Sequence, residues 1–242
     1  MGLQQYWKKR NFQRTPEPRG KNIPPDGRLR FVIQKHAASR LHYDFRLELN
    51  GTLKSWAVPK GPSLDPAQKR LAVHVEDHPL EYAGFEGVIP EKQYGGGTVL
   101  LWDRGYWEPI GDPGSSYRRG RLTFTLHGEK LHGIWNLVRM GGRKEDGKEN
   151  WLLIKEDDEE AQRGKRGEIT QTLEESVASG KTLEQIAAGE HAVWQSKRPS
   201  GEKSPAGSAR RPIKRSLAPG GRKSPLAPWM APQLATLVPT SP

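Results

Sequence analysis

Residues 29–58 read LRFVIQKHAASRLHYDFRLELNGTLKSWAV, and this stretch decides the fold. Apolar residues occupy alternate positions along much of it, which is the pattern of strands with one buried face. The apolar residues on one face of the first strand are Leu29, Phe31 and Ile33, and those of the second strand are Leu41, Tyr43, Phe45, Leu47 and Leu49. The stretch therefore predicts consecutive strands that pack on a shared core.

Asn50-Gly51 separates the second strand from a third, at residues 52–58. Both residue types tolerate a positive φ, so the pair predicts a two-residue β-hairpin turn. A turn of that length fixes the register of the strands on either side of it. The pairs that it predicts are Leu49 with Thr52, Phe45 with Trp56, Tyr43 with Val58 and Arg46 with Ser55.

Further short strands are predicted outward along the chain, at residues 71–75, 98–102, 121–126, 133–140 and 151–155. In the first of these, Leu71, Val73 and Val75 are expected to be buried, which would turn Arg70, His74 and His78 outward. Residues 183–188 fit a short helix with Thr182 as its N-cap. The expected fold is mainly β, a small closed barrel of short antiparallel strands with one or two short helices and disordered basic tails.

Composition limits the size of the core and the kinds of chemistry. Only 33% of the 242 residues are hydrophobic, and 27 Gly and 20 Pro are spread among them, so a packed core does not extend through the whole chain. The absence of cysteine excludes disulfides and thiolate chemistry. No apolar run approaches the roughly 20 residues of a membrane span, so we expect no membrane partner and a cytoplasmic, nucleoid-associated location in a bacterium.

Charge is distributed unevenly around a net value of +11. Residues 1–27 hold six Lys or Arg and two acids, and residues 191–242 hold nine Lys or Arg and one acid. We therefore expect a basic N-terminal arm at 1–27, a nearly neutral barrel domain at 28–190 and a disordered basic linker at 191–225. Basic tails favour binding to nucleic acid, although they also occur as solubilising segments.

Polar residues of the deciding stretch gather on the face opposite the core. His42, Asp44 and Arg46 alternate with the apolar residues, and His36 takes the same side of the preceding strand. Two imidazoles and a carboxylate form a plausible cage for a divalent transition ion with positions left open for substrate. One His-x-Asp pattern on a strand is commonly a solvated surface, but matched residues on adjacent strands favour a metal site.

Several residues on this face carry groups that bind phosphate oxygens. These are Arg46, Ser55, Lys60, Arg70 and His78. His127 and His132 flank a turn and are expected to be structural. The run Tyr94-Gly95-Gly96-Gly97 lacks the helix and lysine of a phosphate-binding loop, so it is interpreted as a turn between strands.

Four segments together resemble the 3′-phosphoesterase domain of bacterial DNA ligase D. They are QKHAASRLHYDFRLE at 34–48, SWAVPKGP at 55–62, KRLAVHVEDHPLEYAGFEG at 69–87 and the WD-x-G-x-W run at 102–107. The resemblance covers roughly residues 6–160. It implies a compact β-barrel enzyme of non-homologous end joining that removes a 3′-terminal ribonucleoside and then hydrolyses the remaining 3′-phosphate to a 3′-hydroxyl.

The resemblance also implies roles for individual residues. His36, His42 and Asp44 would hold the metal, with Mn²⁺ preferred and other divalent transition metals possible. Arg46, His78 and Tyr82 would be catalytic, and Ser55, Lys60 and Arg70 would line the phosphate pocket. Arg10 and Glu17 fall on positions used in ribonucleoside removal, while Asn11 stands where the family usually has Asp.

The implied partners are DNA 3′ ends, namely primer-templates with a 3′-ribonucleotide or 3′-phosphate, together with Ku and the ligase and polymerase domains of DNA ligase D. Residues 226–242 resemble the start of a following ligase domain, which predicts that the chain is part of a larger protein or derives from one. The alternative is a catalytically silent β-barrel that binds DNA ends or a ligase partner.

Overall fold

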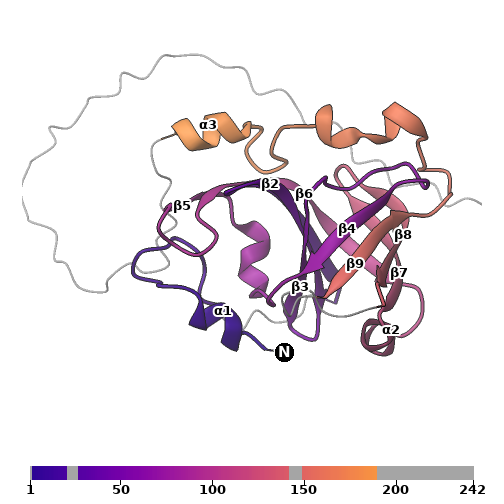
Figure 1. Ribbon diagram of the computed structural model, residues 1–242, viewed down its shortest axis with the longest axis horizontal. Coiled ribbons are helices and arrows are strands. Elements are labelled where there is room, and N and C mark those ends of the chain that lie inside the picture. The colour runs from indigo at the N-terminus through magenta and orange to yellow at the C-terminus, as the bar shows by residue number, and fades with distance from the viewer. Residues whose placement is uncertain (1, 21–26, 142–148, 190–242) are drawn as a thin grey trace, which may run out of the picture. The chain divides into compact units, whose positions relative to one another are not determined.

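A computed structural model describes residues 2–20, 27–141 and 149–189 (Figure 1). In chain order the α-helices and strands are α1 (Gln4–Lys8), β1 (Leu29–Ala37), β2 (Leu41–Leu49), β3 (Thr52–Val58), β4 (Lys69–His74), β5 (Gly87–Ile89), β6 (Gly97–Pro109), α2 (Pro113–Arg119), β7 (Arg121–Gly128), β8 (His132–Arg139), β9 (Asn150–Lys155) and α3 (Leu183–Ala188). Three short 3₁₀ helices, η1 (Leu80–Gly84), η2 (Gly164–Gly167) and η3 (Ile169–Gln171), complete the described elements.

The strands form a closed antiparallel barrel. Their order is β1-β2-β3-β4-β9-β8-β7-β6, and β1 also pairs with β6, which joins the two ends of the sheet. The short strand β5 adds to the other side of β6, outside the ring of eight. The mainly β, closed-barrel expectation is therefore confirmed, with three short α-helices in the part of the chain that the structure describes.

Two hydrophobic clusters lie on opposite sides of the barrel wall. The inner one includes five tryptophans with at most 1% exposure, Trp56, Trp102, Trp107, Trp135 and Trp151. The outer one packs between the wall and the segments that cover it, and includes Tyr6 of α1, Tyr82 of η1 and Val32 of β1. In Figure 1, α1 and α2 lie along the lower side of the barrel, and the segment leading to α3 runs along the upper side.

The hairpin between β2 and β3 has the predicted turn and register. Asn50 and Gly51 adopt φ values of 54° and 74°, as a two-residue turn between twisted strands requires. The register pairs Phe45 with Trp56 and Arg46 with Ser55. Because side chains alternate along a strand, this register places Arg46 and Ser55 together on the outer face.

Two burial expectations were wrong. Leu41 is 50% exposed, because β3 ends at Val58, opposite Tyr43, and leaves Leu41 without a neighbour on that side. In β4 the alternation is reversed: Leu71 is 41% exposed, while Arg70 and Ala72 are buried. The small residue Ala72 takes the inward position, in the same buried cluster as Trp56 and Trp151.

The predicted arm is folded where the structure describes it. Tyr6 of α1 is fully buried and its hydroxyl donates to the Pro18 carbonyl oxygen at 2.5 Å. Neither α2, which begins at the N-cap Asp112, nor β5 was expected from the sequence. The helix at 183–188 is confirmed, with a capping box between Thr182 and Gln185. No described helix has the length and apolar character needed to cross a bilayer.

Candidate active site

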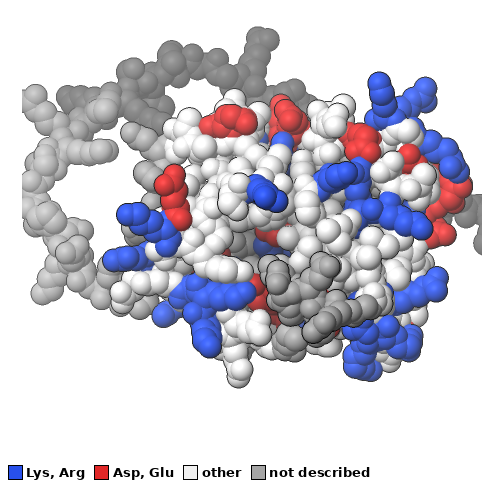
Figure 2. Space-filling model, in the orientation of Figure 1, with Lys and Arg blue, Asp and Glu red and all other residues white. Residues whose placement is uncertain are grey.

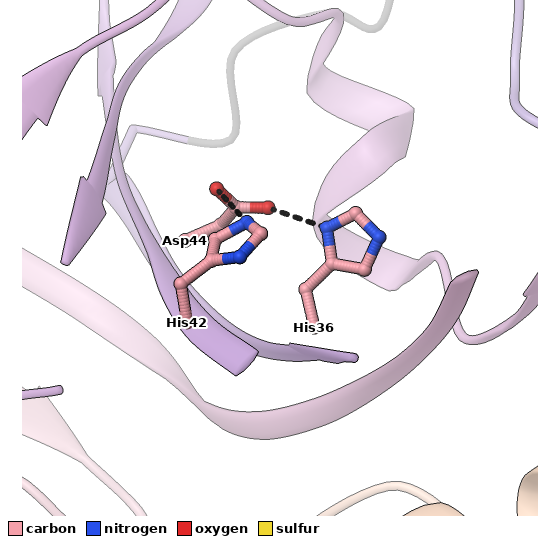
Figure 3. A group of neighbouring side chains, drawn as sticks. All are labelled: His36, His42 and Asp44. Carbon is pink, nitrogen blue, oxygen red and sulfur yellow. Dashed lines mark ion pairs between the residues drawn. The ribbon is translucent and has the colours of Figure 1, made fainter. Parts of the chain in front are cut away.

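Three side chains on the outer face of β1 and β2 converge as a metal-binding group would (Figure 3). His36 and His42 are direct partners across the strand pair, and Asp44 follows on β2. One potential ligand atom from each residue lies within 4.8 Å of the others. His36 Nδ1 lies 3.5 Å from one carboxylate oxygen of Asp44, and His42 Nε2 lies 3.6 Å from the other. The sequence prediction that these three residues share one small area is confirmed.

Backbone carbonyl groups orient both imidazoles. The Gly95 carbonyl oxygen lies 2.9 Å from His36 Nε2, and the Arg40 carbonyl oxygen lies 2.9 Å from His42 Nδ1. A carbonyl only accepts, so each contact places the ring proton on that nitrogen and leaves the other nitrogen able to bind a cation. The two remaining nitrogens are those that point toward Asp44. The donor set and its orientation therefore fit a divalent transition ion.

The glycine run before β6 supplies one of these carbonyls. Gly95 and Gly97 have φ values of 74° and 145°, which favour glycine. A Cβ at Gly97 would lie 2.2 Å from the Ala37 carbonyl oxygen, so only glycine lets the run pass this close to the end of β1. The segment is a turn before β6, as predicted, and it also positions His36.

Arg46 joins the possible metal ligands to the rest of the site. Its side chain is 2% exposed, and its Nη2 donates to Asp44 at 2.9 Å. Its Nε donates to Gln34 Oε1 at 2.9 Å, and its Nη1 donates to the Ser55 hydroxyl at 2.9 Å. Burial alone would raise the pKa of Asp44, but the Arg46 charge and the neighbouring imidazoles hold that pKa below its usual value.

A one-residue bulge brings His78 to the same face. Trp56 pairs with His74, and the Val75 N–H donates to the Ser55 carbonyl, but His78 rather than Asp77 bonds to Leu53. The extra residue reverses the side-chain alternation, so His74 points inward while His78 points outward. The prediction that both face outward was therefore wrong for His74, whose Nε2 instead contacts the Tyr117 hydroxyl at 2.8 Å.

His78 lies between two guanidinium groups. Arg46 Nη1 is 2.8 Å from its Nδ1, and Arg10 Nη2 is 3.1 Å from its Nε2. Burial lowers the pKa of His78 well below its ordinary value, and the charges of Arg46 and Arg10 lower it further. Arginine only donates hydrogen bonds, so a neutral imidazole that accepts from one of them is the form that fits this arrangement.

The N-terminal arm completes the site. Arg10 Nε donates to Glu17 at 2.7 Å, and Arg10 Nη1 donates to Glu76 at 3.1 Å. The Tyr82 hydroxyl donates to the same Glu17 oxygen at 3.1 Å, and the Tyr82 ring lies 4.7 Å from the ring of His78. Burial and the Glu17 charge raise the pKa of Tyr82 well above its usual value, so its phenol remains protonated. The N-terminal arm and the segment from Glu76 to Tyr82 therefore meet in one network around His78.

Two residues expected to line the phosphate pocket lie differently. Lys60 is exposed on the turn after β3. Arg70 faces the barrel interior with Ala72, and its Nη2 lies 2.5 Å from each Glu168 carboxylate oxygen. The structure thus places Arg70 on the opposite face of the sheet from Arg46, and the outward orientation predicted for it was wrong.

Gln34 is a site residue that the sequence reasoning missed. It is fully buried, accepts from Arg46, and its amide donates to the carbonyl oxygens of Tyr82 and Phe85 at 3.0 and 2.8 Å. It thereby links Arg46 to η1. Its position two residues before His36, on the same strand face, was the available signal.

The fold and site together define a closed β-barrel that carries a His-His-Asp group beside buried arginine and histidine on its outer wall. Residues 34–139 match the family described as the DNA Ligase D 3′-phosphoesterase domain. Residues 34–139 therefore form a domain of the DNA ligase D 3′-phosphoesterase family.

Relatives of the chain are much longer proteins. It is 50% identical over 239 residues to the multifunctional non-homologous end joining protein LigD of Pseudomonas aeruginosa, covering 98% of this chain and 26% of the relative. It is 44% identical over 159 residues to LigD of Mycolicibacterium smegmatis, covering 62% of this chain and 20% of the relative. It is 45% identical over 145 residues to the LigD protein of Mycobacterium tuberculosis H37Rv, covering 58% and 18%. The chain thus spans about a quarter or less of these relatives.

Proposed function

We propose that this protein is a metal-dependent 3′-phosphoesterase that repairs DNA 3′ ends for non-homologous end joining. It would remove a 3′-terminal ribonucleoside to leave a 3′-phosphate, and would hydrolyse that phosphate to a 3′-hydroxyl. The observation that carries the proposal is the direct contact between Asp44 of the His-His-Asp group and buried Arg46, within a domain of the phosphoesterase family.

His36, His42 and Asp44 would hold the ion, with Mn²⁺ as the proposed metal, and the ion would supply Lewis-acid chemistry at a phosphate oxygen. Arg46 would bind the other phosphate oxygens, aided by Ser55. The oxygens of a bound phosphate would replace some of the hydrogen-bond partners that Arg46 has in this structure. Lys60 is proposed as a flexible contact from the exposed turn, and Arg70 would have to act through a rearrangement of its Glu168 pair.

His78 is the proposed general acid for the leaving oxygen. Its imidazole is neutral between Arg46 and Arg10, but the negative charge of a bound phosphate would offset both guanidinium charges. The pKa of His78 would then rise, and the ring could take up and deliver a proton. Tyr82, held by Glu17, would orient the His78 ring from the side.

The Arg10–Glu17 pair would act mainly in ribonucleoside removal, because it belongs to the arm that covers the outer side of His78. Ku, the ligase domain and the polymerase domain are the proposed partners. We also propose that residues 226–242 are the start of a following ligase domain. That assignment and the linker predicted at 191–225 lie outside the described residues.

A primer-template that ends in a 3′-phosphate tests the proposal. With Mn²⁺ the protein should release inorganic phosphate and leave a 3′-hydroxyl, and EDTA should stop the release. A second primer-template with one 3′-ribonucleotide should first lose the nucleoside. DNA binding without any phosphate release, across Mn²⁺, Co²⁺ and Zn²⁺, would instead support the silent binding barrel.

A further inference from the structure

A groove in the N-terminal arm opens beside the catalytic residues. It has a volume of about 790 Å³ and is lined by Trp7, Arg10, Asn11, Phe12, Gln13, Arg19 and Gly20. Arg10 belongs both to this groove and to the site, since its Nη2 contacts His78. A molecule with its phosphate at Arg46 and His78 would therefore have the groove as its nearest extension.

The groove presents flat aromatic surface with its orientation fixed. Trp7 is 48% exposed, although tryptophan is usually well buried. Its indole N–H donates to the Arg19 carbonyl oxygen at 2.9 Å, so the polar edge of the ring is held by the protein. The exposed part of the indole therefore offers a ligand an apolar ring surface.

Packing contacts hold the arm that forms the groove. Tyr6, the residue before Trp7, is fully buried, and its ring lies 5.8 Å from the ring of Phe12. The Arg19 guanidinium lies 5.1 Å from the same Phe12 ring. Gly20, with a φ of 96°, passes so close to Pro79 that a Cβ there would lie 3.0 Å away.

The charge of the groove suits a nucleic acid. Arg19 and Arg10 line it, with Arg10 also paired to Glu17 and Glu76, and among the described residues no acidic side chain lines it. Figure 2 shows basic side chains gathered over the region of α1 on the face in view. Positive charge beside an exposed aromatic ring is the combination by which proteins bind single-stranded nucleic acid, with bases stacked on the rings.

We infer that this groove binds the nucleobase of the nucleotide whose 3′ oxygen carries the phosphate, with Trp7 as its stacking surface. The inference rests on the proposed function and adds a base-binding subsite to it. Stacking tolerates every base, so the subsite would hold the 3′ end without selecting its sequence.

Paired changes in protein and substrate test the inference. The substrates are two oligonucleotides with a 3′-phosphate, one with a normal terminal base and one with an abasic terminal sugar. Trp7→Ala should raise KM for the first about tenfold with kcat changed less than about twofold, as loss of one stacked base predicts. Removing the base should raise KM for wild type by a similar factor, and Trp7→Ala should add little to it.

Two further variants separate stacking from a structural role. Trp7→Phe keeps an aromatic ring but loses the bond to Arg19, so its KM should stay within about threefold of wild type. Ile110→Ala changes another exposed apolar residue, 52% exposed, and should have no effect. A Trp7→Phe variant as impaired as Trp7→Ala would overturn the inference. It would also be overturned if the KM increases from Trp7→Ala and from the abasic substrate multiplied in full when the two were combined.

A binding measurement keeps this test independent of catalysis. Fluorescence anisotropy of a labelled oligonucleotide in EDTA reports affinity without turnover, and Trp7→Ala should weaken it about tenfold while Trp7→Phe should not. If wild type releases no phosphate yet shows this pattern, the proposed hydrolysis fails and the base subsite stands. Equal affinity of wild type and Trp7→Ala would remove the subsite and leave the hydrolysis proposal untouched.

Discussion

Arg46 is the residue on which the site is organised. Its guanidinium contacts Asp44 on one side and His78 on the other, and Gln34 and Ser55 fix it from the strands on either side of β2. A lysine could not make these divergent contacts, because its single ammonium lacks the fixed planar geometry. Arg46 thereby connects the His-His-Asp group to His78 in one hydrogen-bonded network.

Asp44→Asn should separate metal binding from folding. The amide keeps the shape but loses the charge, so Mn²⁺ affinity should fall about 100-fold or more and phosphate release should be lost. Buried Arg46 also loses its charged acceptor, so the free energy of unfolding should fall by about 1–3 kcal/mol. Calorimetric titration with Mn²⁺ and urea unfolding measure the two effects.

Asp77→Asn is the matched control for that change. Asp77 is also buried and pairs with Lys54 at 2.6 Å, but it is not in the His-His-Asp group. It should cost similar stability and leave Mn²⁺ affinity within about twofold. Unchanged Mn²⁺ affinity in Asp44→Asn would remove this residue from the ligand set.

His78 should make the protein less stable in mild acid. Its pKa in the folded protein is below the unfolded value of about 6.5, so the unfolded chain binds the proton more tightly. The free energy of unfolding should therefore fall as the pH drops below about 6.5, by up to about 1.4 kcal/mol per pH unit. Urea unfolding from pH 8 to pH 5 should show this slope in wild type and a shallower one in His78→Gln. An equal slope in both proteins would mean that His78 titrates normally.

At the scale of strands and helices, local patterns were predictable and longer-range ones were not. Alternation and the Asn50-Gly51 turn were enough to place β2, β3 and the outward His36, His42 and Asp44, because both signals act within a few residues. The bulge before His78 and the reversed burial in β4 depend on what other strands contribute to the interior. The folded arm depends on the outer cluster, which no single segment encodes.

Asp103 of β6 makes another long-range interaction, because its side chain bonds to the turn between β7 and β8. Its carboxylate is fully buried and accepts the backbone N–H groups of Arg104, Glu129, Lys130 and Leu131, each at 2.9 Å. Burial raises the pKa of Asp103 to about 6 even though these four donors lower it. The Asp103 carboxylate thus accepts hydrogen bonds from backbone N–H groups of this turn, as the carbonyl groups of a neighbouring strand do elsewhere in the sheet.

Asp103→Ala should therefore destabilise the barrel strongly. Four backbone donors lose their acceptor, three of them in one turn, and the free energy of unfolding at pH 7 should fall by about 3 kcal/mol or more. Glu129→Ala removes only a half-exposed ion pair with Arg104 and should cost less than about 1 kcal/mol. Guanidinium unfolding of both variants gives the comparison, and similar losses would contradict this role for Asp103.

At the scale of the whole molecule, the described barrel and the sequence at 191–242 have different characters. The barrel holds the polar site together with Arg10 and Glu17 of the N-terminal arm, whereas the C-terminal sequence contributes nine Lys or Arg against one acid. The domain boundaries predicted from composition remain a proposal, because the C-terminal residues lie outside the described part of the chain.

Ending the chain after Gly189 tests that division. The shortened protein should keep its melting temperature and its Mn²⁺ affinity, because the network described above lies wholly before residue 190. Its DNA affinity should fall, and the dependence of log Kd on log salt should become shallower by about 0.9 for each DNA phosphate that the removed residues had neutralised. Unfolding of the shortened protein, or an unchanged salt slope, would show that the division is wrong.

The closure of the barrel by β1 and β6 has a consequence for the order of folding. Pairing of β1 with β2 joins residues close in the chain, whereas Ala37 meets Thr98 only after about 60 intervening residues have been gathered. Ring closure over that separation is entropically costly and slow, so we expect it to follow the local hairpins. His36, His42 and Asp44 all belong to the early β1–β2 hairpin, while His78 and Arg10 arrive from segments that need the finished wall. The nascent chain would thus assemble the proposed ion-binding group before it assembles the proposed catalytic acid and the arginine beside it.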